Sequence, residues 1–181
     1  MTRTLLIAAV LPLALAAAGA VAQPIGAPTS AFIAKARSTD AFELEAGRLA
    51  EKRGQSPEVR SFGTMMIADH TMTSNELRQT LLKAHLPAPG KPSPDPTQAK
   101  ILADLRAAPK KGFDRAYVHS QVAAHEAALK LMKDYGERGD NPDIKAAAAK
   151  TAPLVAHHLE MARNLEFKVG GTTTGVARHE D

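Results

Sequence analysis

The chain has 181 residues, a formal net charge of +4 and seven histidines, but no cysteine and no tryptophan. The absence of cysteine excludes disulfides, zinc–thiolate sites, iron–sulfur clusters, a cysteine nucleophile and a lipid anchor on an N-terminal cysteine. Aromatic residues make up only 4%, which argues against a stacking platform for single-stranded nucleic acid, so we expect no nucleic-acid partner. The length suits one domain, and the abundant alanine favours helix.

The first 22 residues have the pattern of a secretory signal peptide. Arg3 supplies a short basic region, an apolar run extends from Leu5 to Ala18, and residues 20–22 (AVA) place small side chains before a cleavage point at Gln23. The run is short for a membrane span, and we expect no transmembrane segment in the mature chain. These features predict a periplasmic or secreted protein. The modest positive charge leaves open self-association or weak contact with the cell envelope.

After a linker at residues 23–29, four long segments show helical periodicity. The first extends from Ser30 to Arg53, with Gly54 as its expected C-terminal cap. The second opens with a serine cap, a proline and an acid at residues 56–58 and extends to Leu86.

The third segment extends from Phe113 to Arg138. The fourth extends from residues 141–143 (NPD) to Val169, with Pro153 expected to bend it. We expect the bundle to occupy residues 30–170 and the tail, residues 171–181, to be disordered.

The link between the second and third segments decides the topology. Residues 87–96 are half proline and cannot be helical, and a short amphipathic stretch follows at residues 97–107. Two tight hairpins joined by a long crossover predict an all-α, ferritin-like four-helix bundle. A plain four-helix bundle with a flexible loop is the alternative.

Each of the four helices places one metal-competent side chain on an otherwise apolar face. These side chains are Glu43, His70, His125 and His158, and all four lie near the middle of their helices. Mid-helix residues share one level in a bundle whichever way each helix points, so the three histidines and Glu43 form a candidate metal site.

Asp69 and Gln121 are candidates for orienting the metal ligands. The same residues would also make a buried hydrogen-bond network without metal. Nitrogens about 3–4 Å apart would favour a site, whereas separations beyond about 8 Å would favour the network.

The residue types favour zinc, copper or nickel over a di-iron centre. Di-iron bundles use Glu-x-x-His pairs, but Ile67, Val122 and Val155 stand three residues before the histidines. Met66 and Met161 lie one turn from a histidine, which suits copper, although methionine is also a common core filler.

Four motifs in this order resemble a known family. They are ELEAGRLA at 43–50, MMIADHT at 65–71, FDRAY with QVAAH at 113–117 and 121–125, and KTAP with HL at 150–153 and 158–159. The family is the ferritin-like domain-of-unknown-function family DUF4142, often labelled "predicted outer membrane protein", and the resemblance covers roughly residues 31–166. It implies an exported four-helix bundle and supplies no activity. We expect a periplasmic location in place of the outer membrane.

The sequence therefore supports two main hypotheses. The first is an exported bundle that binds one transition metal and serves in metal handling or stress protection. The second is a structural or protein-interaction module with a buried polar network. No catalytic residue is assigned. An enzyme is a third hypothesis with the least support, which an exposed cleft reaching His70 would favour and a sealed core would disfavour.

Overall fold

The computed structural model describes residues 25–87 and 90–170, and these contain helices but no strand. The predicted signal peptide, its cleavage point and the tail at residues 171–181 lie outside the described residues. The elements are α1 (Ala27–Arg53), α2 (Pro57–Lys83), α3 (Pro96–Ala107), a 3₁₀ turn η1 (Lys110–Gly112), α4 (Phe113–Arg138) and α5 (Pro142–Gly170). The predicted all-α class is confirmed.

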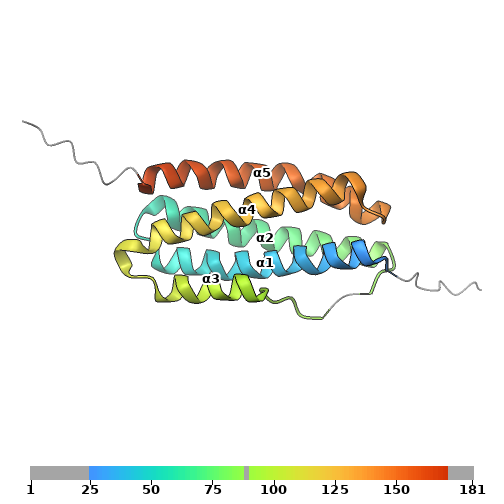
Figure 1. Ribbon diagram of the computed structural model, residues 1–181, viewed down its shortest axis with the longest axis horizontal. Coiled ribbons are helices and arrows are strands. Elements are labelled where there is room, and N and C mark those ends of the chain that lie inside the picture. The colour runs from blue at the N-terminus through green and yellow to red at the C-terminus, as the bar shows by residue number, and fades with distance from the viewer. Residues whose placement is uncertain (1–24, 88–89, 171–181) are drawn as a thin grey trace, which may run out of the picture.

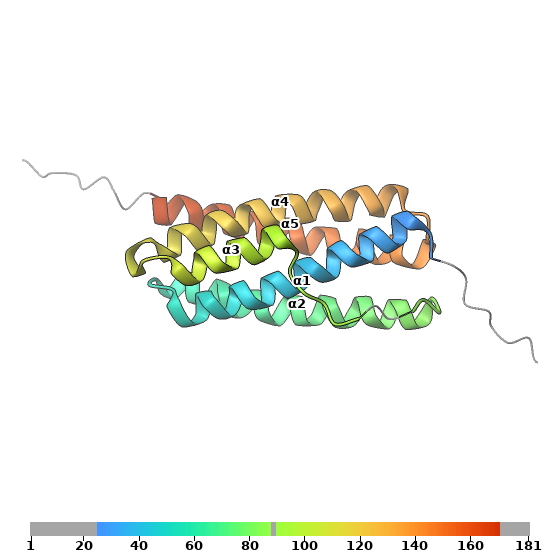
Figure 2. The same ribbon diagram turned by 60° about the horizontal axis from the view of Figure 1, so that its bottom comes forward.

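The four long helices form a bundle built from two antiparallel hairpins, α1–α2 and α4–α5 (Figure 1). Additional contacts join α1 to α4 and α2 to α5, while α3 lies along the outside against α1 and α4 (Figure 2). The chain leaves α2 at one end of the bundle and enters α4 at the other, so these two helices run in the same direction. A long crossover of this kind is the ferritin-like arrangement, as the proline-rich link predicts.

The end of α2 differs from the prediction. The helix stops at Lys83, three residues earlier than expected, because His85 adopts a left-handed conformation with φ 53°. The His85 amide then donates to the Leu82 carbonyl at 3.2 Å, and the Leu86 amide donates to the Leu81 carbonyl at 2.9 Å. This is a Schellman motif, and Leu81 and Leu86 are buried in the same apolar cluster, whereas Leu82 is exposed.

The connection between α1 and α2 also differs in detail. Gly54 has φ −54°, so it is not the left-handed glycine cap that the sequence suggests, although its amide still donates to the Ala50 carbonyl. Ser56 caps α2 as predicted, because its hydroxyl accepts from the Val59 amide at 3.2 Å. The tight turn sets α2 directly against α1.

Helix α5 continues through Pro153 from Pro142 to Gly170. Proline cannot donate to the carbonyl of Ala149, one turn earlier. Both residues are exposed, so water can satisfy that carbonyl. The proline is therefore accommodated within the helix.

The interior consists of two apolar clusters with a polar layer between them. One cluster gathers around Phe42, Met66 and Val118, and the other around Phe32 and Ile144. The buried polar residues that separate them lie near the middle of the helices and are Asp40, Glu43, His70, Gln121, His125 and His158. The candidate site is therefore a full cross-section of the bundle core.

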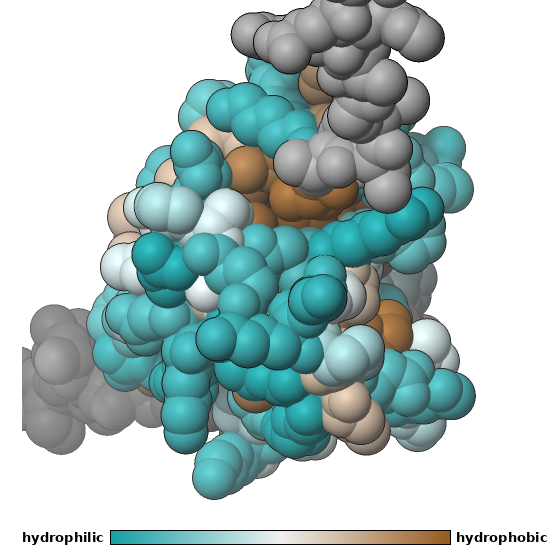
Figure 3. All heavy atoms as spheres, turned by 90° about the vertical axis from the view of Figure 1, so that its left-hand side faces the viewer, coloured by the Kyte–Doolittle hydropathy of each residue, from teal (hydrophilic) through white to brown (hydrophobic). Residues whose placement is uncertain are grey.

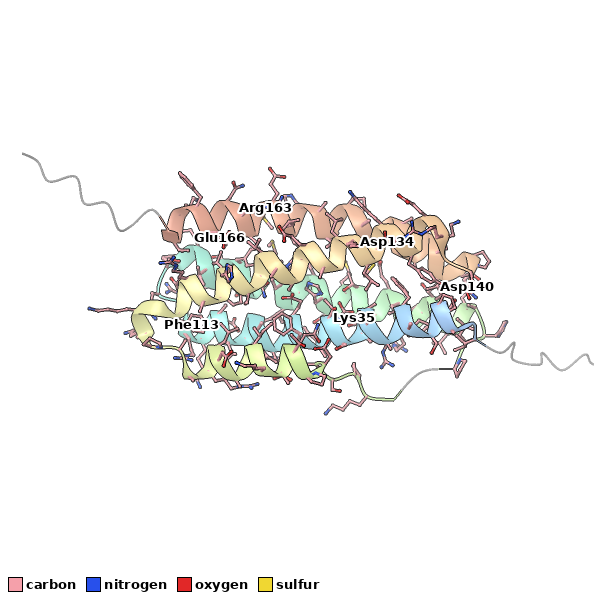
Figure 4. The ribbon with its side chains drawn as sticks, in the orientation of Figure 1. Lys35, Phe113, Asp134, Asp140, Arg163 and Glu166 are labelled. Atoms are coloured by element: carbon pink, nitrogen blue, oxygen red, sulfur yellow. The ribbon has the colours of Figure 1, made fainter. Side chains whose placement is uncertain are left out.

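Side chains fasten the bundle at both ends, which Phe113 and Asp140 mark in Figure 4. At one end the Arg53 guanidinium donates to the carbonyls of Leu105, Arg106 and Ala108 at 2.5 to 2.6 Å and lies over the Phe113 ring. This arginine of α1 thereby caps α3 and contacts the start of α4.

Hydrophilic residues cover most of this end of the bundle, which lies on the left in Figure 1 and faces the viewer in Figure 3.

At the opposite end of the bundle the Thr29 hydroxyl contacts the Tyr135 hydroxyl at 2.6 Å and donates to Asp140 at 2.5 Å. The start of α1 is thereby tied to the turn between α4 and α5.

Glycines allow α1 and α2 to approach closely. A Cβ on Gly63 would lie 2.7 Å from the Ala50 Cβ, 2.8 Å from the Gly47 carbonyl oxygen and 3.1 Å from the Glu51 amide nitrogen. Most of these atoms belong to the backbone, so relief requires the two helices to move apart.

We predict that Gly63→Ala lowers the free energy of unfolding by about 1–3 kcal/mol, as overpacking of a core does, although alanine is the better helix former. Denaturant unfolding followed by circular dichroism measures this. Gly112→Ala is the matched control, since a Cβ there meets nothing closer than 3.5 Å and φ is −100°. Equal stability of the two variants would contradict the close approach of the helices.

Candidate metal centre

Three histidines from three helices meet in the core. His70 lies on α2, His125 on α4 and His158 on α5, and only 6%, 1% and 1% of their surfaces are exposed. One nitrogen from each ring lies within 4.8 Å of one nitrogen from each of the others. Ring centroids are 5.4 to 5.9 Å apart. The level match that the sequence predicts therefore brings these three side chains together.

The outward-facing nitrogen of each ring is held by an acceptor. His70 donates from Nδ1 to Asp40 Oδ1 at 2.8 Å. His158 donates from Nε2 to Asp69 Oδ2 at 2.9 Å. These two acceptors are carboxylates, so each fixes the tautomer of its imidazole and increases its basicity.

His125 uses a backbone acceptor. Its Nδ1 donates to the carbonyl oxygen of Gln121, one turn earlier on α4, at 2.9 Å. Gln121 thus orients His125, as the sequence analysis proposed, but through its main chain.

The second nitrogen of each ring is buried and has no hydrogen-bond partner among the described residues. These atoms are Nε2 of His70, Nε2 of His125 and Nδ1 of His158. In a neutral imidazole whose other nitrogen donates a proton, this atom carries a lone pair. The core therefore gathers three imidazole lone pairs at one level.

Burial keeps two of the imidazoles neutral. It lowers the pKa of His125 and of His158 to about 4, and in His158 the hydrogen bond to Asp69 only partly opposes this. Burial also lowers the pKa of His70, but the hydrogen bond to Asp40 and the nearby Glu43 carboxylate outweigh it, so that pKa is raised. His70 is therefore the most basic of the three.

Asp40 is a functional residue that the sequence analysis missed. Its carboxylate also accepts from the hydroxyls of Thr73 at 3.1 Å and Ser74 at 2.7 Å, both on α2. Asp40 precedes Glu43 by three residues and so shares its helix face, which is the signal that would have found it. It holds His70 in place from the neighbouring helix.

Glu43 lies beside the histidine cluster and is not one of the three grouped side chains. Its Oε1 is 3.9 Å from Nδ1 of His125, the nitrogen that already donates to Gln121. Burial raises the pKa of this carboxyl, with His70 and the Gln121 amide acting in the opposite direction. Among the described residues neither oxygen has a partner with the geometry of a hydrogen bond, and the same holds for the Tyr117 hydroxyl and the Gln121 amide atoms.

The donor set suits a transition-metal ion. A tetrahedral ion with imidazole ligands at about 2.0 Å requires nitrogens about 3.3 Å apart, and small side-chain rotations close a gap of up to 4.8 Å. Three imidazole ligands favour zinc, copper or nickel. Met66 packs in the apolar cluster next to the site, as a core residue would.

A cavity of about 790 Å³ lies along α2 and α5 and reaches His70 and His158. Because α2 ends and α5 begins at the same end of the bundle, the cavity occupies that half of the molecule, on the right in Figure 1. The side chains of His70 and His158 therefore border this cavity, while the unpartnered nitrogens of the cluster are themselves buried.

The fold and the histidine cluster define an all-α, ferritin-like bundle with a metal-competent core. The model of the family described as "Domain of unknown function (DUF4142)" matches residues 13–165, so the chain belongs to this family. The resemblance drawn from the four motifs is thereby confirmed.

The crystal structure of a DUF305 fragment from Deinococcus radiodurans is similar to this chain, with a TM-score of 0.66 and 17% identity. The match covers 82% of this chain and 99% of the fragment. At this identity the likeness concerns the fold. A comparison with curated proteins gives no match.

We predict that Glu43→Gln raises the melting temperature of the metal-free chain at pH 8. The pKa of Glu43 is raised in the folded chain above its ordinary 4.5, so wild-type stability falls as pH rises above 4.5. The variant lacks this cost, and its advantage should vanish near pH 4. Thermal scans from pH 4 to 8 measure the difference. Glu51→Gln on the exposed face of α1 is the control, and a pH-independent advantage of Glu43→Gln would contradict the prediction.

Proposed function

We propose that this chain binds one transition-metal ion through His70, His125 and His158. Two observations carry the proposal: each of the three buried rings offers one nitrogen within 4.8 Å of the others, and each ring has one buried nitrogen without a hydrogen-bond partner among the described residues. Each ring is oriented by an acceptor on its other nitrogen, which is the usual environment of a metal-binding histidine. In this proposal the three imidazoles are the ligands. Glu43, whose Oε1 lies 3.9 Å from His125 Nδ1, adds negative charge near the site.

The alternative is a buried polar network that needs no metal. Such a network would pair the inward-facing atoms with one another. Three imidazole nitrogens, the Glu43 carboxylate and the Tyr117 hydroxyl have no such partners, so the metal-binding function is better supported. Each unsatisfied buried group costs about 1–3 kcal/mol, and a bound ion would offset this for the imidazoles.

The proposed setting is the periplasm. It rests on the N-terminal pattern of a basic residue, an apolar run and small residues before Gln23. An exported bundle with one buried site would serve in metal handling or protection against metal stress. Among residues 25–87 and 90–170, no helix is long and apolar enough to cross a membrane.

We predict that the full chain binds one equivalent of zinc, copper or nickel and that the triple variant His70→Ala, His125→Ala, His158→Ala binds none. Metal analysis after gel filtration measures the stoichiometry. At a metal concentration 100 times the dissociation constant, binding should add about 2.7 kcal/mol to the stability of the wild type.

The control removes two histidines outside the cluster, through His119→Ala and His157→Ala. Both residues are exposed. Equal metal content in the wild type and the triple variant, or a melting temperature that no metal changes, would refute the proposal and leave the polar network.

We also predict that Asp69→Asn weakens metal affinity by about 10- to 100-fold while the chain stays folded. An amide accepts the His158 proton less strongly than a carboxylate does, and Asp69 is partly exposed, so the change disturbs the core little. Competition with a chelator measures the affinity. Asp104→Asn on the exposed face of α3 is the control. Unchanged affinity of Asp69→Asn would show that this carboxylate does not support the site.

A further inference from the structure

The cavity along α2 and α5 has the size and lining of a ligand site. Its volume, about 790 Å³, lies within the range of about 300–1,000 Å³ typical of small-molecule pockets. Its walls include the apolar side chains of Phe32, Leu77, Met132, Leu154 and Val155. A molecule that fills it gains affinity chiefly through its own apolar surface.

The inner end of this cavity is polar and belongs to the histidine cluster. His70 and His158 line it together with Asp40, whereas His125 lies behind them. Three protein ligands leave a tetrahedral ion with one open position. Only the His70 and His158 side of the cluster borders the cavity. The unpartnered nitrogens of these rings are buried, so an outside ligand would reach the ion from this side as the two side chains move apart.

The charges around the cluster define the preferred head group. The Asp40 and Asp69 carboxylates contact His70 and His158 directly, and the Glu43 carboxyl group lies beside His125, so the protein already supplies enough negative charge to balance a divalent ion held by neutral imidazoles. A neutral donor at the open position preserves this balance, whereas a carboxylate adds an uncompensated negative charge to a buried site.

We propose that the cavity binds a small molecule with an apolar body and a neutral nitrogen or oxygen head that occupies the open position of the bound metal. The proposal rests on the metal-binding function above. It assigns this face of the bundle as the route to the ion, and it makes the chain a receptor for a ligand as well as for a metal.

The test titrates the cobalt(II)-loaded full chain with 1-methyl-, 1-butyl- and 1-hexylimidazole and follows the d–d absorption of the ion. All three should change the spectrum, with affinity rising about fourfold for each methylene that the cavity buries. Heptanoate, which has a similar apolar body but an anionic head, should bind at least tenfold more weakly than 1-hexylimidazole.

A wall variant separates the cavity from the ion. Ala147→Phe places a ring into the cavity from α5, and it should remove the gain from the longer chains while cobalt content and 1-methylimidazole binding persist. Ala127→Phe, on the exposed face of α4 and outside the cavity lining, should behave as the wild type.

The outcomes distinguish the two proposals. A chain that takes up none of zinc, copper, nickel and cobalt overturns the metal-binding function and this inference with it. A cobalt-loaded chain whose spectrum no ligand changes, whose affinity ignores chain length, or which prefers heptanoate overturns the inference alone.

Discussion

The structure depends on a layer of buried polar side chains that divides the apolar core in two. Burying a polar group is unfavourable unless it finds a partner, and this layer crosses four helices at one level. Its outer nitrogens are satisfied, since Asp40, Asp69 and the Gln121 carbonyl each accept a hydrogen bond from one imidazole. The inner nitrogens have no hydrogen-bond partner among the described residues, so the layer carries an unfavourable burial that its own hydrogen bonds do not offset. This imbalance is the physical basis of the proposed metal site.

The rest of the bundle holds this layer rigidly. The glycines of α1 and α2 permit a close approach, and that approach lets Asp40 on one helix accept from His70, Thr73 and Ser74 on the other. Arg53 ties α1 to α3 at one end of the bundle and to the start of α4. The proline-rich crossover carries the chain back along the bundle, so that α4 enters from the end where it can place His125 opposite His70. The contacts that pack the helices against one another thus also set the geometry of the histidine cluster.

Much of this was predictable because helical periodicity is a strong signal. It places Glu43, His70, His125 and His158 on the buried faces and at one height, and the bounds of α4 follow from its flanking glycines. Details governed by individual backbone angles were not predictable. His85, not a glycine, adopts the left-handed conformation that ends α2, while Gly54 does not adopt it. Periodicity also cannot tell which way a side chain turns, so it places Glu43 with the histidines, whereas the grouped metal-competent side chains are the three histidines alone among the described residues.

The three imidazoles differ in basicity, and the cause of this difference bears on how the core would hold a metal ion. Burial lowers the pKa of His125 and His158 to about 4, so both are neutral at physiological pH and ready to bind an ion. The pKa of His70 is raised because Asp40 and Glu43 favour its charged form despite burial. The carboxylates that favour positive charge on His70 would equally favour a cation held between the three rings, so the proposed metal site and the raised pKa of His70 have the same electrostatic cause.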